Sequence, residues 1–142
     1  MRIGVDVMGG DNAPDAILEG ALDALDRLDA DDELVLVGDG DVIKAGLDAR
    51  GISSDAVTIV ATTESIGMSE SPVEAVRSKT DSSLAVLARL SKKKNNDAPL
   101  DVSISAGNTG AFVSAAQMHM RRLPNVHRPG IAVTVPTFAG KV

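Results

Sequence analysis

The sequence predicts an α/β fold, a mostly parallel sheet with helices on both faces. Short apolar runs, typical of buried strands, alternate along the 142 residues with longer segments of helical periodicity. Glycine-bearing turns follow several of these runs. Parallel strands need crossover connections, and the helical segments between the runs can supply them. We therefore expect residues 1–142 to form one α/β domain.

The first strand is expected at Arg2–Val7, because this apolar run is bounded by a turn. Two adjacent glycines, Gly9-Gly10, then permit a sharp bend with positive φ. Asn12 is expected to cap the helix that follows, and Pro14 lies in the first turn, where its missing N–H has no cost. An apolar stripe extends this helix to about Leu28.

The second strand is expected at Glu33–Val37, whose nearly continuous apolar character suits a strand covered on both faces. Gly38-Asp39-Gly40 has only part of a dinucleotide-binding pattern, so we interpret it as a turn into a helix over Asp41–Ala49. Gly51 ends that helix. The third strand is expected at Val57–Ala61.

A polar segment, Thr62–Glu70, follows the third strand and is a lid, a binding loop or a plain connection. Ser71-Pro72-Val73-Glu74 has the pattern of a capping box and predicts a helix through Lys79. A further helix is expected over Leu84–Lys92. Asp81 is expected to cap its start.

The turn Ser105-Ala106-Gly107-Asn108-Thr109-Gly110 organises the chain. It follows a fourth expected strand, Leu100–Ile104, and precedes a helix that ends near Arg121-Arg122 and is capped by Asn108 or Thr109. Free N–H groups at the positive end of a helix dipole suit an anion such as phosphate. The alternative is a tight strand-to-helix turn with no ligand. A fifth strand is expected at Ile131–Val135.

Ligands of parallel sheets bind beyond the carboxyl ends of the strands. The glycine turns after the first and fourth strands and the loop after the third strand all lie at that edge of the predicted sheet. This convergence predicts a binding site there.

Composition narrows the classes of function. The chain has two phenylalanines and no tryptophan or tyrosine, so it lacks aromatic side chains for stacking the bases of single-stranded nucleic acid. With no cysteine, it has no disulfide, thiolate metal site or cysteine nucleophile, which fits a reducing compartment. The opening residues indicate a strand rather than a signal peptide, and no apolar run is long enough to span a bilayer. The acidic residues and histidines show no metal-ligand spacing, so we expect no metal and no cofactor.

Charge is distributed unevenly along the chain. Residues 1–71 hold 4 basic and 16 acidic side chains, whereas residues 72–142 hold 10 basic and 4 acidic ones. One interpretation is solvated helix faces of opposite sign. The other is that the basic part faces an anionic substrate or an acidic protein.

Four motifs occur together and in order: Met8-Gly9-Gly10-Asp11-Asn12-Ala13-Pro14; Arg77 with Lys79-Thr80-Asp81-Ser82-Ser83; Ser105-Ala106-Gly107-Asn108-Thr109-Gly110-Ala111; and Arg128-Pro129-Gly130-Ile131-Ala132. In this combination the chain resembles the acyl-carrier-protein:phosphate acyltransferase family of bacterial phospholipid synthesis. The resemblance covers essentially all 142 residues.

The resemblance implies transfer of a fatty acyl group from acyl carrier protein to inorganic phosphate, giving the acyl phosphate used to make phospholipids. It implies a fold like that of phosphotransacetylases and of isocitrate and isopropylmalate dehydrogenases. It also implies a cytoplasmic homodimer with peripheral membrane association, acting on no nucleic acid. Members of that family are much longer, so we expect this chain to be an N-terminal portion that lacks full activity on its own and leaves a strand as an open edge.

For the site, the resemblance and the residues together suggest catalytic roles for Asn108, Asp11 and Arg128. Asp11 holds loop backbone or accepts a proton from phosphate, or is only a turn residue. Backbone donors at the glycine turns stabilise anionic groups, and cationic side chains neutralise phosphate. The expected binding residues are Gly9, Gly10, Asn12, Arg77, Lys79, Ser82, Ser83, Ser105, Gly107, Thr109, Gly110 and His127.

Two other functions stay open. One keeps the fold and changes the donor, to give short-chain phosphotransacylation from coenzyme A. The other is a non-catalytic module that binds an anion or a carrier protein through the basic second part of the chain.

Overall fold

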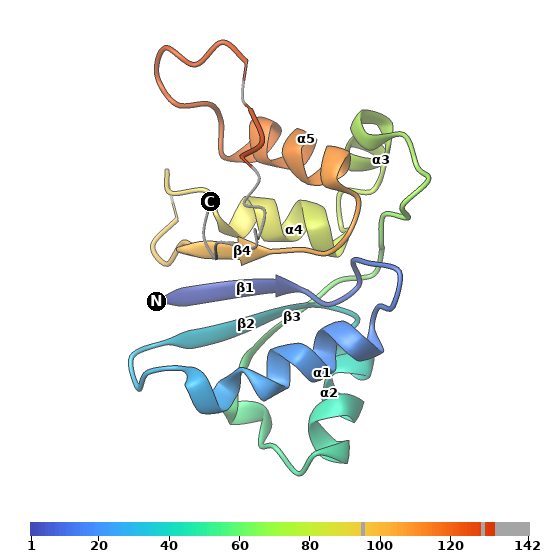
Figure 1. Cartoon of the computed structure of the whole chain (residues 1–142), viewed down its shortest axis with the longest axis vertical. Coiled ribbons are helices and arrows are strands. Elements are labelled where there is room, and N and C mark those ends of the chain that lie inside the picture. The colour runs from blue at the N-terminus through green and yellow to red at the C-terminus, as the bar shows by residue number, and fades with distance from the viewer. Residues whose placement is uncertain (95, 129, 133–142) are drawn as a thin grey trace, which may run out of the picture.

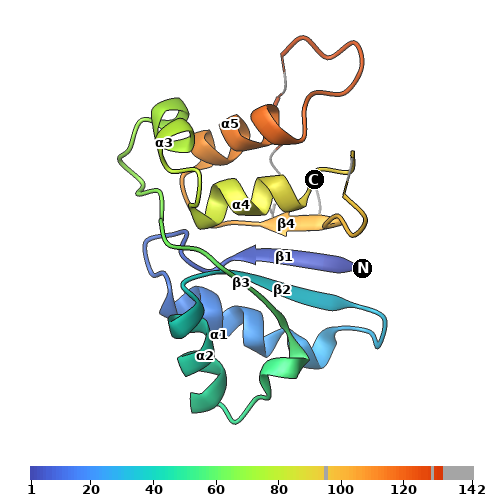
Figure 2. The same cartoon turned by 180° about the vertical axis from the view of Figure 1, so that it is seen from behind.

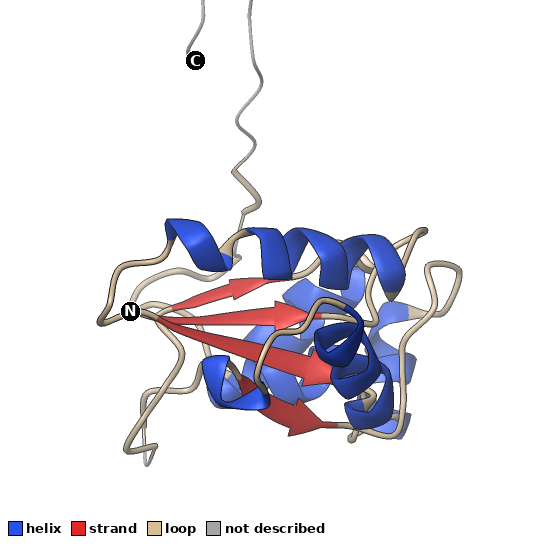
Figure 3. Ribbon diagram, turned by 90° about the horizontal axis from the view of Figure 1, so that it is seen from below, coloured by secondary structure: helices blue, strands red, loops and turns tan. Residues whose placement is uncertain are grey.

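Four parallel strands form the centre of the computed structural model, which describes residues 1–94, 96–128 and 130–132. They are β1 (Arg2–Asp6), β2 (Glu33–Gly38), β3 (Thr58–Ala61) and β4 (Val102–Ile104), in the sheet order β3-β2-β1-β4 (Figure 1). All four strands point to the same end of the sheet (Figure 3). Their carboxyl ends therefore share one edge, as the alternation of apolar runs and helical segments predicts.

Helices cover both faces of this sheet, which confirms the predicted α/β class (Figures 1 and 2). One face carries α1 (Asp15–Asp23) and α2 (Gly40–Ala49). The other carries α4 (Ser83–Leu90), against which α5 (Thr109–His119) packs, with α3 (Pro72–Ser78) beside α5. Two short 3₁₀ helices, Leu25–Arg27 and Ser54–Ala56, lie in connections.

The core is aliphatic and divides between the two faces. Beneath α1 and α2, Leu18 and Ile43 pack with Val5 and Leu36 of the central strands. On the other face, Leu87 of α4 belongs to a cluster with strand residues of β2. A third cluster joins α3, α4 and α5 through small side chains, among them Ala75, Ala88, Ala111 and Ala115. Small residues let these helices approach closely, so the first turn of α5 is fixed by packing.

Within the described part of the sheet, β4 is an edge strand. Val102 and Ile104 lie on the face of α1 and α2, but these helices do not cover them, and they are 41% and 50% exposed. Whether β4 is the open edge expected for the whole chain stays a prediction. Of the expected fifth strand, Ile131 and Ala132 are described and are not in a strand, while residues 133–135 lie outside the described residues.

Three predicted helix caps are wrong. The cap position of α1 is Pro14, with no side-chain hydrogen bond, so Asn12 does not cap it. Ser71 occupies the cap position of α3 but makes no capping bond. Ser82, rather than Asp81, caps α4, and the Asp81 carboxylate instead accepts hydrogen bonds from Thr63. For Asp81, the tertiary contact with Thr63 competes with the helix start.

Two helices are shorter than periodicity suggested. The helix expected to reach Leu28 ends as an α-helix at Asp23 and continues as 3₁₀, because the chain must turn toward β2. α5 ends at His119, and Arg121 follows with a φ of +74°. Gly51, with a φ of +65°, closes α2 as predicted.

Candidate functional site

The bends after β1 and β4 lie against each other at the carboxyl edge of the sheet. The two strands are parallel neighbours, so the residues that follow them emerge side by side. A Cβ atom placed on Gly107 would lie 3.1 Å from the Cα of Gly9. At Gly10, where φ is +123°, a Cβ atom would lie 3.2 Å from the Cβ of Ala106. The two glycine turns that the sequence places at one edge are therefore in contact.

A buried carboxylate joins these bends from below. Ser105 Oγ donates a 2.8 Å hydrogen bond to Asp6 Oδ2, and Asp6 Oδ1 accepts the N–H of Met8 at 3.1 Å. Ser105 Oγ also accepts the N–H of Gly107 at 3.1 Å. A Cβ atom at position 9 would lie 2.4 Å from Asp6 Oδ2, so any residue other than glycine there would force the Asp6 carboxylate to shift.

Asp6 is 1% exposed and was not among the predicted site residues. In the sequence, the feature that points to Asp6 is its position as an acidic residue at the end of an otherwise apolar strand, shortly before Gly9 and Gly10. A buried carboxylate is costly unless it is hydrogen-bonded, so its position beneath the bends indicates that it holds them in place.

Several backbone donors at this edge are unpaired. Within residues 1–94, 96–128 and 130–132, the following N–H groups donate to no protein acceptor: Gly9, Gly10, Asn108, Thr109 and Gly110. Three of them lie at the start of α5, where the helix dipole is positive. Such an arrangement can bind an anion or an oxygen atom that becomes negative during a reaction.

Asn108 links α5 to the segment after β3. Its Oδ1 accepts the N–H of Ala111 at 3.0 Å, which confirms the predicted helix cap. Its Nδ2 lies 3.2 to 3.3 Å from three carbonyl oxygens, and the side chain is buried. Those carbonyls belong to Gly67, Met68 and Glu70. The segment 62–70 is therefore fastened beside the first turn of α5.

Lys79 also holds the segment 62–70 in place through hydrogen bonds. Its Nζ donates to Glu70 Oε1 at 2.7 Å and to the carbonyl of Ser65 at 2.9 Å, while Glu70 Oε1 also accepts the N–H of Gly67 at 2.6 Å. The hydrogen bond from Lys79, followed by that from Gly67, lowers the pKa of the Glu70 carboxyl. The charge of Lys79 is thus already paired within the loop.

Ser82 and Ser83 are 0% and 1% exposed. Ser82 Oγ caps α4 by accepting the N–H of Ala85 and donates to the carbonyl of Lys79. Both hydroxyl-bearing residues therefore belong to the interior in this structure. Arg77, by contrast, is exposed in the last turn of α3.

Asp11 and Asn12 are exposed directly after the first bend, and their side chains hydrogen-bond to no other described residue. The structure does not bring His127 and Arg128 to the bends. Both lie in the loop beyond the far end of α5, where the guanidinium of Arg122 donates to the carbonyl of His127 (Figure 1). At 1.5 Å per residue, the 11 residues of α5 place about 16 Å between its two ends.

A family model described as "Fatty acid synthesis protein" matches residues 1–142 of the chain. The chain belongs to this fatty acid synthesis protein family. Proteins named "Phosphate acyltransferase" from Oceanobacillus iheyensis and Acetivibrio thermocellus are 42% and 40% identical over 141 residues, and a protein of the same name from Akkermansia muciniphila is 41% identical over 140 residues. Each match covers 99% of this chain. The chain spans 40%, 40% and 39% of the length of these three relatives.

The described residues show neither a metal-binding cluster nor a membrane-spanning helix. The described residues contain no cluster of three or more His, Asp or Glu side chains placed to hold a metal ion. None of the helices in the described ranges combines the length and the apolar character that crossing a membrane requires.

Proposed function

We propose that this chain forms the phosphate-binding part of an acyltransferase that moves a fatty acyl group from acyl carrier protein to inorganic phosphate. The product is an acyl phosphate for phospholipid synthesis. The contact between the Gly9 and Gly107 bends, with unpaired N–H groups around it, carries this proposal. The family and the relatives named phosphate acyltransferase support the same reaction class. The proposal extends to a cytosolic homodimer that meets the membrane peripherally, as the motif resemblance implies.

The reaction needs positioning and charge stabilisation rather than a protein nucleophile. An oxygen of phosphate forms a bond to the carbonyl carbon of the thioester, and the carbonyl oxygen becomes negative. The carbon–sulfur bond then breaks, and the carrier's thiolate leaves and takes a proton from water. Fixed amide donors can hold both the phosphate and the developing oxyanion without reorganising during the step.

Within this proposal the roles of the residues are distinct. The N–H groups of Gly9, Gly10, Thr109 and Gly110 bind anionic oxygen atoms. Asp6, Ser105 and Asn108 act as positioning residues because their side chains hold the bends and the first turn of α5.

Asp11, exposed beside the first bend, accepts a proton when the bound phosphate is protonated. Arg77 is the exposed cation of α3 and is assigned to phosphate charge. Arg128, beyond the other end of α5, is assigned no part in the bends.

The test is formation of acyl phosphate, trapped with hydroxylamine, by the full-length natural chain that carries these 142 residues. We expect product from acylated carrier protein and phosphate. Gly9→Ala should lower kcat/KM for phosphate at least about 100-fold, because the new methyl group displaces Asp6 and the bend. Gly20→Ala, whose added Cβ meets nothing within 4 Å, is the matched control and should leave kcat/KM unchanged.

Two results would contradict the proposal. If no thioester donor gave acyl phosphate, the proposed acyl transfer to phosphate would be wrong. A strong preference for short-chain coenzyme A thioesters over acylated carrier protein would replace it with short-chain phosphotransacylation.

A further inference from the structure

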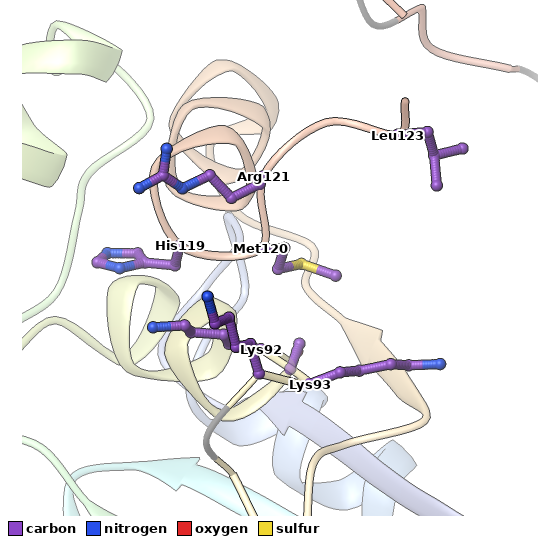
Figure 4. A pocket seen from close by; sticks show the side chains of 8 residues that line it. Lys92, Lys93, His119, Met120, Arg121 and Leu123 are labelled. Carbon is purple, nitrogen blue, oxygen red and sulfur yellow. The ribbon is translucent and has the colours of Figure 1, made fainter. Parts of the chain in front are cut away.

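An open hollow of about 750 Å³ lies where α4 and α5 end, at the end of α5 opposite to the glycine bends. Lys92 and Lys93 line it from the segment after α4. His119, Met120 and Arg121 line it from the end of α5, and Figure 4 shows this helix end above Lys92 and Lys93, with Leu123 set apart on the following loop.

The hollow is positively charged. Lys92, Lys93, Lys94 and Arg121 line it, and no carboxylate of a described residue does. None of these four cations forms a salt bridge with a described residue. The side chain of His119 also lies near positive charge. Burial, followed by the charges of Arg89 and Lys92, lowers the pKa of its imidazole. A surface of this kind attracts an acidic partner.

The hollow also exposes apolar side chains. Leu123 is 76% exposed and Met120 is 45% exposed, so two large apolar side chains are open to solvent beside the cations. Methionine adapts its shape to varied partners. A flat bilayer surface cannot fill a hollow, whereas side chains of a helix can enter one. The shape therefore favours an acidic helix of a protein over a lipid surface.

A second hollow, of about 380 Å³, continues from the first. It shares Arg121 and Leu123 with the larger hollow and is also lined by Ala116 and Val113 of α5. α5 thus carries hollowed surface at its end and along its side, while its first turn carries the unpaired N–H groups at the bends.

We infer that the hollow between the ends of α4 and α5 is the docking surface for an acidic helix of the carrier protein. This inference rests on the proposed function, in which that carrier delivers the acyl thioester. The glycine bends lie at the other end of α5, about 16 Å from the hollow, so the thioester of a carrier docked there would have to reach along the side of this helix. Docking and chemistry are then at opposite ends of one helix.

The test measures binding of carrier protein without an acyl group to the 142-residue chain by calorimetry at low salt. Lys92→Glu/Lys93→Glu should raise Kd at least tenfold, because attraction becomes repulsion at two positions. Arg27→Glu/Lys44→Glu, which changes two exposed cations on the side of α1 and α2, is the matched control and should alter Kd less than twofold. Thermal melts establish that both variants fold.

Several outcomes would overturn the docking surface: no binding of the carrier by the unmodified chain, equal weakening by both double variants, or no weakening by either. Binding of phosphatidylglycerol vesicles in place of the carrier, lost in Lys92→Glu/Lys93→Glu, would identify a membrane surface instead.

The docking surface and the reaction can fail separately. If the full-length chain makes acyl phosphate but Lys92→Glu/Lys93→Glu leaves KM for acylated carrier unchanged, only the docking surface is wrong. If the carrier binds as expected but no acyl phosphate forms, the docking surface stands and the proposed reaction is wrong.

Discussion

Ser105 Oγ donates a hydrogen bond of 2.8 Å to Asp6 Oδ2, across 99 positions of sequence. This bond joins the ends of β1 and β4 just below the contact between their glycine bends. Ser105→Ala should lower the free energy of unfolding by about 2 kcal/mol, because it removes a hydrogen bond to a buried charged group. Asp6→Asn should lower the free energy of unfolding by a similar amount. In urea unfolding the double variant should cost at least about 0.5 kcal/mol less than the sum of the two, and strict additivity would show that the two side chains act separately.

Contact, rather than backbone angle, favours glycine at position 9. A Cβ atom there would lie 2.4 Å from Asp6 Oδ2 and 2.9 Å from Ser105 Oγ. Gly9→Ala should therefore destabilise the fold by about 1 to 3 kcal/mol, as overpacking of interiors does. In the exposed middle of α1, Gly20→Ala should stabilise by about 0.5 to 1 kcal/mol, because alanine is the better helix former. Thermal unfolding of the two variants compares them directly, and equal effects would contradict the packing argument.

The sequence was sufficient to predict that the glycine turns of the candidate site lie at one edge of the sheet. Alternating apolar runs and helical segments require parallel strands, so the glycine turns had to share one end. It was insufficient for Asp6, whose importance comes from the approach of Ser105, a residue 99 positions away. It also failed to separate Arg128 from the bends, because the path of a loop after a helix depends on packing that local patterns do not encode.

Helix caps illustrate the same limit. Asn12 and Asp81 each have the chemistry of a cap. Asp81 is instead engaged by the backbone and hydroxyl of Thr63 from the neighbouring loop, and Asn12 lies outside the helix start. For α5 the sequence left Asn108 and Thr109 as alternative caps, and the structure selects Asn108, whose Oδ1 accepts the N–H of Ala111.

The hydroxyl of Thr62 is a buried polar group without a hydrogen-bond partner among the described residues. Thr62→Val keeps the shape and removes this cost, so it should raise the free energy of unfolding by about 1 kcal/mol. Thr58→Val is the matched change in the adjacent strand β3. It should destabilise by about 1 kcal/mol, because Thr58 Oγ1 donates to Glu33 Oε1 at 2.7 Å. Denaturant titrations that gave the same sign for both would contradict this assignment.

The segment 62–70 should respond to acid. The pKa of Glu70 is lowered by its hydrogen bonds from Lys79 and Gly67. A carboxyl whose pKa is lowered in the folded state stabilises that state above its unfolded pKa, about 4.3, and loses the contribution as pH falls through the folded value. As pH falls through this lowered pKa, the N–H of Gly67 should therefore lose its charged partner. An NMR titration should show a Gly67 midpoint below that of an ordinary glutamate and no such step in Glu70→Gln, whereas a midpoint above the ordinary value would contradict the tie.

The most direct test of the central claim is a titration of the 142-residue chain with inorganic phosphate, followed by amide NMR shifts. Binding at the bends predicts saturable shifts of Gly9, Gly10, Thr109 and Gly110, which are lost in Gly9→Ala and retained in Gly20→Ala. Shifts confined to the far end of α5, around Lys92 and Arg121, or no saturable shifts at all, would contradict an anion site at the meeting of the two bends.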